Sequence, residues 1–149
     1  MFEINCQMVN LRLKKTIFVH NPNFQPPPQG QHIAVALHLQ NGGNFEDDTT
    51  VNFVQNFRTV PGPQMPFNLE VEFEALFTLS EPVPENKKFS YIHLVFPQFV
   101  FPHVRDYVAE TTKLGGFPPL TLNLELFKDG QRHEFESDVP VVASTKWTH

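Results

Sequence analysis

The seven histidines are the first residues to test for chemistry, because imidazole is a common metal ligand. A metal site needs ligands at short regular spacing, such as HxH or HExxH, or a cysteine partner nearby. His32 and His38 are six residues apart on an expected strand, which separates them by about 20 Å at the rise of a strand. The others are scattered: His20, His93, His103, His133 and His149. We therefore expect no metal site and no cofactor.

Three glutamates, Glu70, Glu72 and Glu74, alternate along one expected strand and so share one of its faces. Paired carboxylates can perform acid–base catalysis, but on a strand whose opposite face is apolar they normally form a solvated charged face. Docking of a basic partner is the alternative role for this stripe. The sequence has no GxSxG motif, no glycine-rich phosphate cradle and no Ser/His/Asp grouping. We therefore predict that the protein is not an enzyme.

The single cysteine, Cys6, excludes an intrachain disulfide and is compatible with a reducing compartment. Cys6 lies in an alternating apolar run, which favours a small buried hydrophobe over a catalytic thiol. The net charge of −5, with only 11 Lys and Arg residues, argues against a nucleic-acid surface.

Phenylalanine is the unusual feature of the composition: 16 Phe stand against 1 Trp and 2 Tyr. Phe offers a large apolar area with no polar group to satisfy. Such a surplus can fill a core, or some of the rings can line a groove for apolar partners. Composition alone leaves both interpretations open.

The length of 149 residues predicts one domain, residues 1–149. The first residues have neither a basic n-region nor an apolar h-region, so we expect no signal peptide. No run approaches the roughly 18 apolar residues needed to cross a bilayer, so we expect no membrane insertion. These features predict a cytoplasmic protein.

Alternating apolar residues predict a four-stranded antiparallel sheet with one dry face and one wet face. The expected strands cover residues 2–19, 33–39, 50–60 and 67–79. A one-residue phase slip at Met8-Val9 indicates a β-bulge in the first strand. The proline-rich stretch 21–30 predicts an extended crossover loop. Asn41-Gly42-Gly43-Asn44 predicts a turn by composition.

The period of the apolar residues then changes from two to that of a helix. Pro102 suits the first position of a helix, and Gly115-Gly116 supplies its stop, which gives about thirteen helical residues. The apolar residues at helical spacing are Val104, Tyr107, Val108, Thr111 and Leu114. The fold class is therefore α+β.

Residues 97–127 carry the most specific pattern. Two Phe-Pro pairs, Phe101-Pro102 and Phe117-Pro118, bracket the expected helix, and Arg105-Asp106 lies near its start. This resembles the signature of the SecB-like family of export chaperones, in which a Phe-Pro pair and an Arg-acid pair open the long helix and Gly-x-Phe-Pro-x-Leu-x-Leu follows it. The matching positions are Pro97, Phe101, Pro102, Arg105, Asp106, Gly115, Phe117, Pro118, Leu120 and Leu122.

The resemblance implies a four-stranded sheet with a crossover, a long helix at subunit contacts, and a homotetramer built as a dimer of dimers. It also implies an apolar groove that binds extended segments of unfolded or nascent polypeptides without nucleotide. The residues on which we place this groove are Ile33, Val35, Leu37, Phe96, Phe99 and Phe101. The alternative for each is the core of the subunit or a subunit interface.

The sequence also departs from the family. Export members dock the zinc-bearing tail of the SecA motor on acidic residues of the sheet, and Glu70 occupies one such position. Two further acidic positions, near the end of the first strand, carry Thr16 and His20 here. A second helix should follow the matched stretch, but Asp129-Gly130 and Pro140 predict an extra C-terminal hairpin in its place.

Three functions remain open from the sequence. The first is a general or export holdase, with the SecA motor as its partner in export. The second is a SecB-like chaperone dedicated to one partner, such as an antitoxin. The third is an assembly or structural protein that uses the fold for oligomerisation alone.

Overall fold

The computed structural model describes residues 4–24, 32–63, 65–122 and 138–146, which form five strands and a helical layer. The strands are β1 (Cys6–His20), β2 (His32–Asp47), β3 (Thr50–Thr59), β4 (Phe67–Leu79) and β5 (Asp138–Lys146). The helical layer comprises a 3-10 turn (Glu85–Lys87), α1 (Lys88–Ser90), a π-helical turn (Tyr91–Val95) and α2 (Phe96–Leu114).

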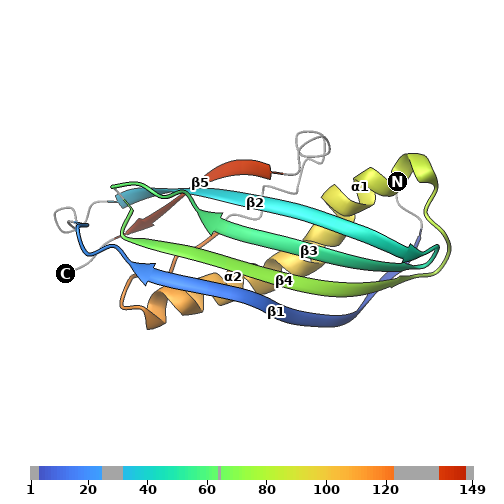
Figure 1. Cartoon of the computed structure of the whole chain (residues 1–149), viewed down its shortest axis with the longest axis horizontal. Coiled ribbons are helices and arrows are strands. Elements are labelled where there is room, and N and C mark those ends of the chain that lie inside the picture. Colours follow the sequence, from blue (N-terminus) through green and yellow to red (C-terminus); the bar gives the residue numbers. More distant parts are fainter. Residues whose placement is uncertain (1–3, 25–31, 64, 123–137, 147–149) are drawn as a thin grey trace.

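The strands form one antiparallel sheet in the order β1-β4-β3-β2-β5 (Figure 1). β1 and β2 are consecutive in sequence but separated by two strands in the sheet, so the connection between them must cross it. The predicted crossover is confirmed by this order, although residues 25–31 lie outside the described part of the chain.

β1 contains two register shifts where the sequence pattern predicted one. The shift between Met8 and Asn10 confirms the predicted bulge. A second shift, between Leu13 and Lys15, reverses which residues of β1 face each side of the sheet. Beyond it, Ile17 pairs with Glu70. The pattern of apolar residues did not reveal this second bulge. Leu13 and Ile17 lie on opposite faces of the sheet, but they are four residues apart, so their spacing is that of two residues on the same face.

The turn predicted at Asn41-Gly42-Gly43-Asn44 is wrong, because β2 continues through these residues to Asp47. The side chain of Ile92 lies so close to Gly43 that a Cβ atom there would come within 2.8 Å of the Ile92 Cδ1. Glycine therefore lets Ile92 pack closely against mid-strand backbone and does not mark a turn. The chain turns after Asp47, whose Oδ1 accepts a hydrogen bond of 2.9 Å from the Thr49 N–H.

The helix begins earlier than predicted, since the chain is helical from Glu85 and α2 itself begins at Phe96. Pro97 lies where the π-helical turn runs on into α2, and Pro102 lies inside the helix. The carbonyl deprived of a partner by Pro102 is that of Gln98, an exposed residue whose carbonyl can bond to water. That exposure explains why Pro102 is tolerated in mid-helix.

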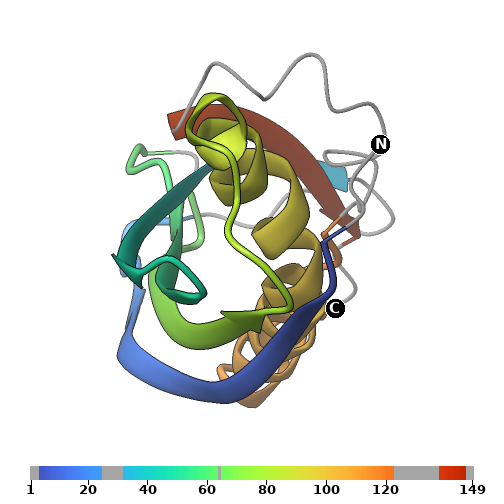
Figure 2. The ribbon, with the colours of Figure 1, turned by 90° about the vertical axis from the view of Figure 1, so that its right-hand side faces the viewer.

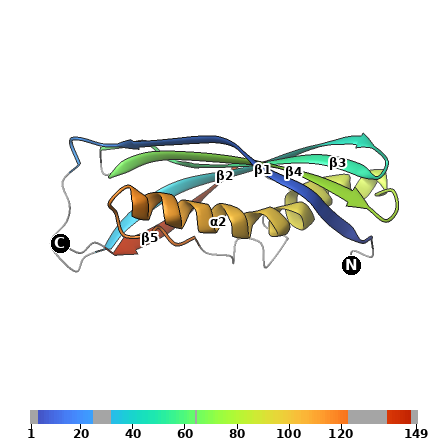
Figure 3. The ribbon, with the colours of Figure 1, turned by 90° about the horizontal axis from the view of Figure 1, so that it is seen from below.

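The sheet curves around the helical layer, which covers one of its faces (Figures 2 and 3). We call this the inner face and the opposite one the outer face; no described element covers the outer face. Alternate residues of β2, β3 and β4 point to the inner face and are buried against the helices. The inner-face residues of the core include Leu37, Leu39, Val51, Phe53, Phe57, Leu69, Val71, Phe73, Ala75 and Phe77.

β5 is a fifth strand that the sequence pattern did not predict. It pairs with β2 from His32 to Gln40 and forms the edge of the sheet opposite β1. The predicted hairpin turn at Asp129-Gly130 lies outside the described residues. Among the helices of the described part, none is long and apolar enough to cross a membrane.

Candidate functional site

Aromatic rings fill the space between α2 and the inner face. Phe96 stacks on Phe77 with 4.6 Å between ring centroids, and it packs against Phe53 at 6.0 Å. Phe99, one turn further along α2, meets the edge of Phe77 at 5.7 Å and is 42% exposed. The apolar layer therefore reaches the surface at Phe99.

The residues predicted to line a groove lie in this layer, but most of them are covered. Val35, Leu37, Phe96 and Phe101 are each no more than 2% exposed. The side chain of Ile33 lies outside the described part of the structure. In this conformation the four covered residues form part of the core. Phe99 is exposed, so a partner can reach it.

A second aromatic cluster, which the sequence did not reveal, lies at the other end of the inner face. Phe18 stacks on Phe67 at 5.3 Å, and Phe117 packs on Phe67 at 5.0 Å and on His20 at 4.9 Å. The cluster joins the end of β1 to the segment after α2. Gly115 is required beside it, because a Cβ atom there would lie 2.4 Å from the Phe18 ring.

The second bulge places Thr16 and His20 on the inner side of β1. The Thr16 hydroxyl is 2.9 Å from the Tyr107 hydroxyl of α2, and His20 lies in the aromatic cluster with Phe117. Neither residue accompanies Glu70 on the outer face. The β1 residues in register with the acidic stripe are Arg12, opposite Glu74, Lys15, opposite Glu72, and Ile17, opposite Glu70.

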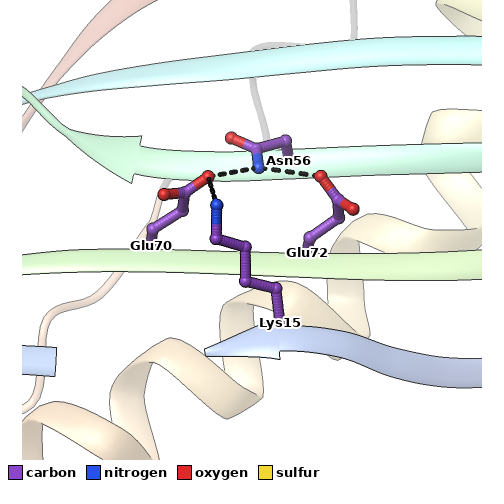
Figure 4. Close-up of polar contacts among 4 residues, drawn as sticks. All are labelled: Lys15, Asn56, Glu70 and Glu72. Carbon is purple, nitrogen blue, oxygen red and sulfur yellow. Dashed lines mark hydrogen bonds and ion pairs between the residues drawn. The ribbon is translucent and has the colours of Figure 1, made fainter. Parts of the chain in front are cut away.

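The carboxylates of the acidic stripe of β4 contact polar and basic side chains of the neighbouring strands (Figure 4). Lys15 Nζ lies 3.2 Å from Glu70 Oε2. The Asn56 side-chain amide donates to Glu70 Oε2 at 2.9 Å and to Glu72 Oε1 at 3.0 Å. The Asn56 hydrogen bond, followed by the Lys15 contact, lowers the pKa of Glu70 below its ordinary value. Glu70 is thus a carboxylate that already has both a cation and an amide donor.

The same arrangement repeats four residues further along β4, at Glu74. Arg12 Nε donates to Glu74 Oε1 at 2.7 Å, and the Asn52 amide donates to Glu74 Oε2 at 3.4 Å. The Arg12 hydrogen bond is the main reason that the pKa of Glu74 is lowered. Basic residues of β1 and asparagines of β3 therefore flank the acidic stripe from both sides.

A hollow of about 230 Å³ lies beside Glu70. Its lining mixes the exposed aliphatic side chain of Ile17 with charged and polar groups. The lining residues are Ile17, Arg58, Thr59, Pro61, Asn68, Leu69 and Glu70. Beyond the hollow, Val19 is also exposed.

The described residues offer neither a metal-binding cluster nor an activated thiol. In the part of the chain that the structure describes, no three His, Cys, Asp or Glu side chains come together to hold a metal ion. Burial raises the pKa of the Cys6 thiol, so that the reactive thiolate is disfavoured. The partly buried Cys6 packs against the core, as expected of a small hydrophobe.

Comparison with known proteins identifies the family. The family model of the preprotein translocase subunit SecB matches residues 14–129. The protein-export protein SecB of Beijerinckia indica is 27% identical over 113 residues, which span 73% of this chain and 70% of the relative. That of a Bradyrhizobium species is 30% identical over 113 residues, 73% of this chain and 69% of the relative. The chain belongs to the SecB family.

A solved structure agrees on the fold. The SecB-like chaperone of Mycobacterium tuberculosis, determined in complex with a ChAD peptide from the HigA1 antitoxin, is 20% identical. It superposes with a TM-score of 0.62 over 80% of this chain and 90% of that chain. The predicted SecB-like fold, with four antiparallel strands and a long helix, is confirmed. The SecB match ends at residue 129, so β5 lies beyond the part of the chain shared with the family model.

Proposed function

We propose that this SecB-family protein is an ATP-independent holdase that binds non-native polypeptides in the apolar layer between α2 and the inner face. The observation that carries the proposal is the continuity of that layer with the surface at Phe99. An apolar contact suits unfolded clients of many sequences, because apolar burial is non-directional. Covering about 300 Å² at ~25 cal/mol per Å² stabilises a complex by several kcal/mol, less the cost of ordering the client.

The groove that we propose comprises Ile33, Val35, Leu37, Phe96, Phe99 and Phe101. Because four of these side chains are covered here, clients are expected to make first contact at Phe99. The deeper residues then become accessible only if α2 shifts relative to the sheet. Phe99 is therefore a better residue for mutation than the others, since Val35 or Phe96 variants would also damage the core.

An aggregation assay tests the holdase activity. Several unrelated denatured proteins are diluted into buffer without ATP, with and without the purified protein, and light scattering is followed. We expect suppression by the wild type and a loss of most of it in Phe99→Ser. Leu114→Ser is the matched control, because Leu114 is an exposed apolar residue at the other end of α2. Failure of the wild type with every client would leave an assembly or structural role as the better explanation.

The second candidate is a chaperone dedicated to one partner, such as an antitoxin. The solved relative with the antitoxin peptide shares the fold of this chain, which supports this alternative. The same assay separates the two candidates, because a dedicated chaperone would protect one partner and leave the unrelated clients to aggregate.

For export, we propose Glu70 as the residue that would dock the SecA motor. Its carboxylate already contacts Lys15 and Asn56, so a basic partner must compete with groups of the same chain. We therefore expect weak docking, which Lys15→Ala strengthens and Glu70→Lys abolishes in a pull-down with purified SecA. No binding by either the wild type or Lys15→Ala would exclude a role for this face in export.

We also propose a homotetramer built as a dimer of dimers, located in the cytoplasm. β1 is a long edge strand with four exposed apolar residues, and such an edge favours pairing with a second copy. These residues are Val9, Leu13, Ile17 and Val19. Light scattering at several concentrations is expected to give the tetramer mass, and a strictly monomeric protein would contradict the proposal.

A further inference from the structure

The β2 edge of the sheet is occupied by a segment of the same chain. All nine residues of β5 pair antiparallel with β2, in a register without bulges from His32↔Lys146 to Gln40↔Asp138 (Figure 1). The paired part of β2 includes Ile33, Val35 and Leu37, which we assign to the client groove. β5 therefore lies in extended conformation along the backbone of the proposed groove.

The sequence of β5 resembles the kind of extended segment that a holdase would bind in an unfolded client. It reads Asp-Val-Pro-Val-Val-Ala-Ser-Thr-Lys, with β-branched and small residues between one acidic and one basic end. Pro140, opposite His38, has no N–H to donate and is tolerated only at a sheet edge. β5 thus shows which kind of strand the β2 edge accepts.

The attachment of β5 is local. Among the described elements, β2 is the only one with which β5 shares an extended contact, whereas β4 packs against β1, β3 and α2. β5 also lies outside the residues matched by the SecB family model. A strand held by one neighbour can leave without dismantling the layer of Phe53, Phe77 and Phe96, which lies on β3, β4 and α2.

We propose that β5 is an intramolecular stand-in for client, and that an extended client segment of about nine residues binds by replacing β5 on β2. Backbone hydrogen bonds to β2 then supply affinity that is independent of client sequence, as in other cases of strand addition. Because the edge is available only when β5 has left, the apparent affinity for client is reduced by the fraction of molecules in which it is covered. The proposal rests on the holdase function and adds how a client is held and what competes with it.

A reversible cross-link tests the proposal on the full chain. Ala36 and Val142 are directly opposite in the register, so their Cα atoms lie about 4.5–5.5 Å apart, within the range of a disulfide. Ala36→Cys and Val142→Cys are combined in a Cys6→Ser background, and binding of reduced, alkylated lactalbumin is measured with and without reductant. The matched control is Gln7→Cys with Thr78→Cys, a directly paired position of β1 and β4.

We expect the oxidised β2–β5 variant to bind the unfolded probe at least tenfold more weakly than its reduced form, and the β1–β4 control to bind equally in both forms. Equal binding by both forms of the β2–β5 variant would overturn the proposal and leave the holdase function intact. Failure of the disulfide to form would overturn the assigned register and the proposal with it. If the wild type also fails to bind the probe, the holdase function itself is wrong.

Hydrogen exchange supplies a second readout that needs no mutation. When the wild type is saturated with the alkylated probe, amides of 138–146 are expected to lose protection while those of 32–40 keep it. Unchanged or stronger protection of β5 in the complex would contradict replacement. Ala143→Pro removes a donor at a position of opposite parity to Pro140, where the N–H points towards β2. This variant is expected to tighten probe binding severalfold, and weaker binding would count against the proposal.

Discussion

The two faces of the sheet are built from the same strands but stabilised by different interactions. On the inner face, rings such as Phe53, Phe77 and Phe96 exclude water and pack at centroid distances of 4.6 to 6.1 Å. On the outer face, the carboxylates of Glu70 and Glu74 are paired with cations and amides of the flanking strands. The inner face therefore holds the fold together and supplies apolar surface, while the outer face presents a charge pattern that is largely compensated within the chain.

Truncation of the central inner ring is the strongest test of this contrast. Phe96→Ala is expected to lower the free energy of unfolding by about 3–5 kcal/mol, since Phe96 is fully buried among four other aromatic rings. Lys15→Ala on the outer face is expected to cost less than about 1 kcal/mol, as an exposed ion pair does. Urea unfolding at one fixed protein concentration measures both, and similar losses would contradict the contrast.

Two adjacent glycines of β2 allow the same comparison with a matched pair of variants. Gly43→Val forces side-chain atoms into the space held by Ile92 and is expected to destabilise the protein by about 1–3 kcal/mol. Gly42→Val meets open space, and it gains the strand propensity of valine, so that it is expected to be neutral or stabilising by up to about 1 kcal/mol. Thermal unfolding in parallel would reveal the sign of each change, and equal losses would contradict the assignment of Gly43 to the packed face.

As the pH falls, the stability contributed by the helical layer is expected to decrease at a higher pH than the stability contributed by the outer face. Burial lowers the pKa of His93 below 6.5, so the unfolded chain takes up a proton before the folded one does. Stability should therefore fall as the pH drops from about 6.5 towards the lower folded pKa. His93→Gln is expected to flatten the dependence of the unfolding midpoint on pH in this window. An unchanged slope would show that His93 is not held neutral in the folded protein.

The stability contributed by the outer face should decrease only at a lower pH. Because the pKa of Glu70 is lowered in the folded state, the stability that this group contributes is present above its unfolded pKa near 4.5, and is lost as the pH falls through its folded value. Asn56→Ala removes the largest cause and is expected to raise the pKa of Glu70 towards its ordinary value in an NMR titration. Glu70 titrating at the same pH in both proteins would contradict the role of Asn56.

Apolar periodicity predicted most of the sheet because the strands are long and bury one face. The segment from Phe67 to Leu79 alternates without interruption, and β4 has the bounds that this pattern predicts. The bulge at Met8 was visible because it changes the parity of the apolar residues. The bulge at Leu13 was not, because the residues that follow it on the outer face, Ile17 and Val19, are apolar as well.

The errors came from residues whose role depends on a distant neighbour. Gly42-Gly43 has the composition of a turn, and only the position of Ile92 shows why glycine stands in mid-strand. Proline is common at the start of a helix, which is why Pro102 was placed there. Only the exposure of Gln98 shows why the helix tolerates Pro102 in its interior.

The candidate site was predicted in part. The family resemblance located the apolar layer, but the extent to which Val35 and Phe96 are covered depends on packing between elements far apart in the sequence. β5 could not be predicted from alternation, because Val139, Val141 and Val142 do not follow a strict period of two and Pro140 interrupts the run. The neutralisation of Glu70 likewise depends on Lys15 and Asn56, which come from two other strands.

The central claim is that non-native polypeptide binds at the inner face, entering at Phe99, and does not bind at the outer face. Site-specific photo-cross-linking tests it most directly, with p-benzoylphenylalanine placed at Phe99 or at Val54, an outer-face residue of β3 opposite Glu74. With reduced, alkylated lactalbumin in excess, we expect covalent adducts from position 99 and few or none from position 54. Adducts from position 54 alone would contradict the account.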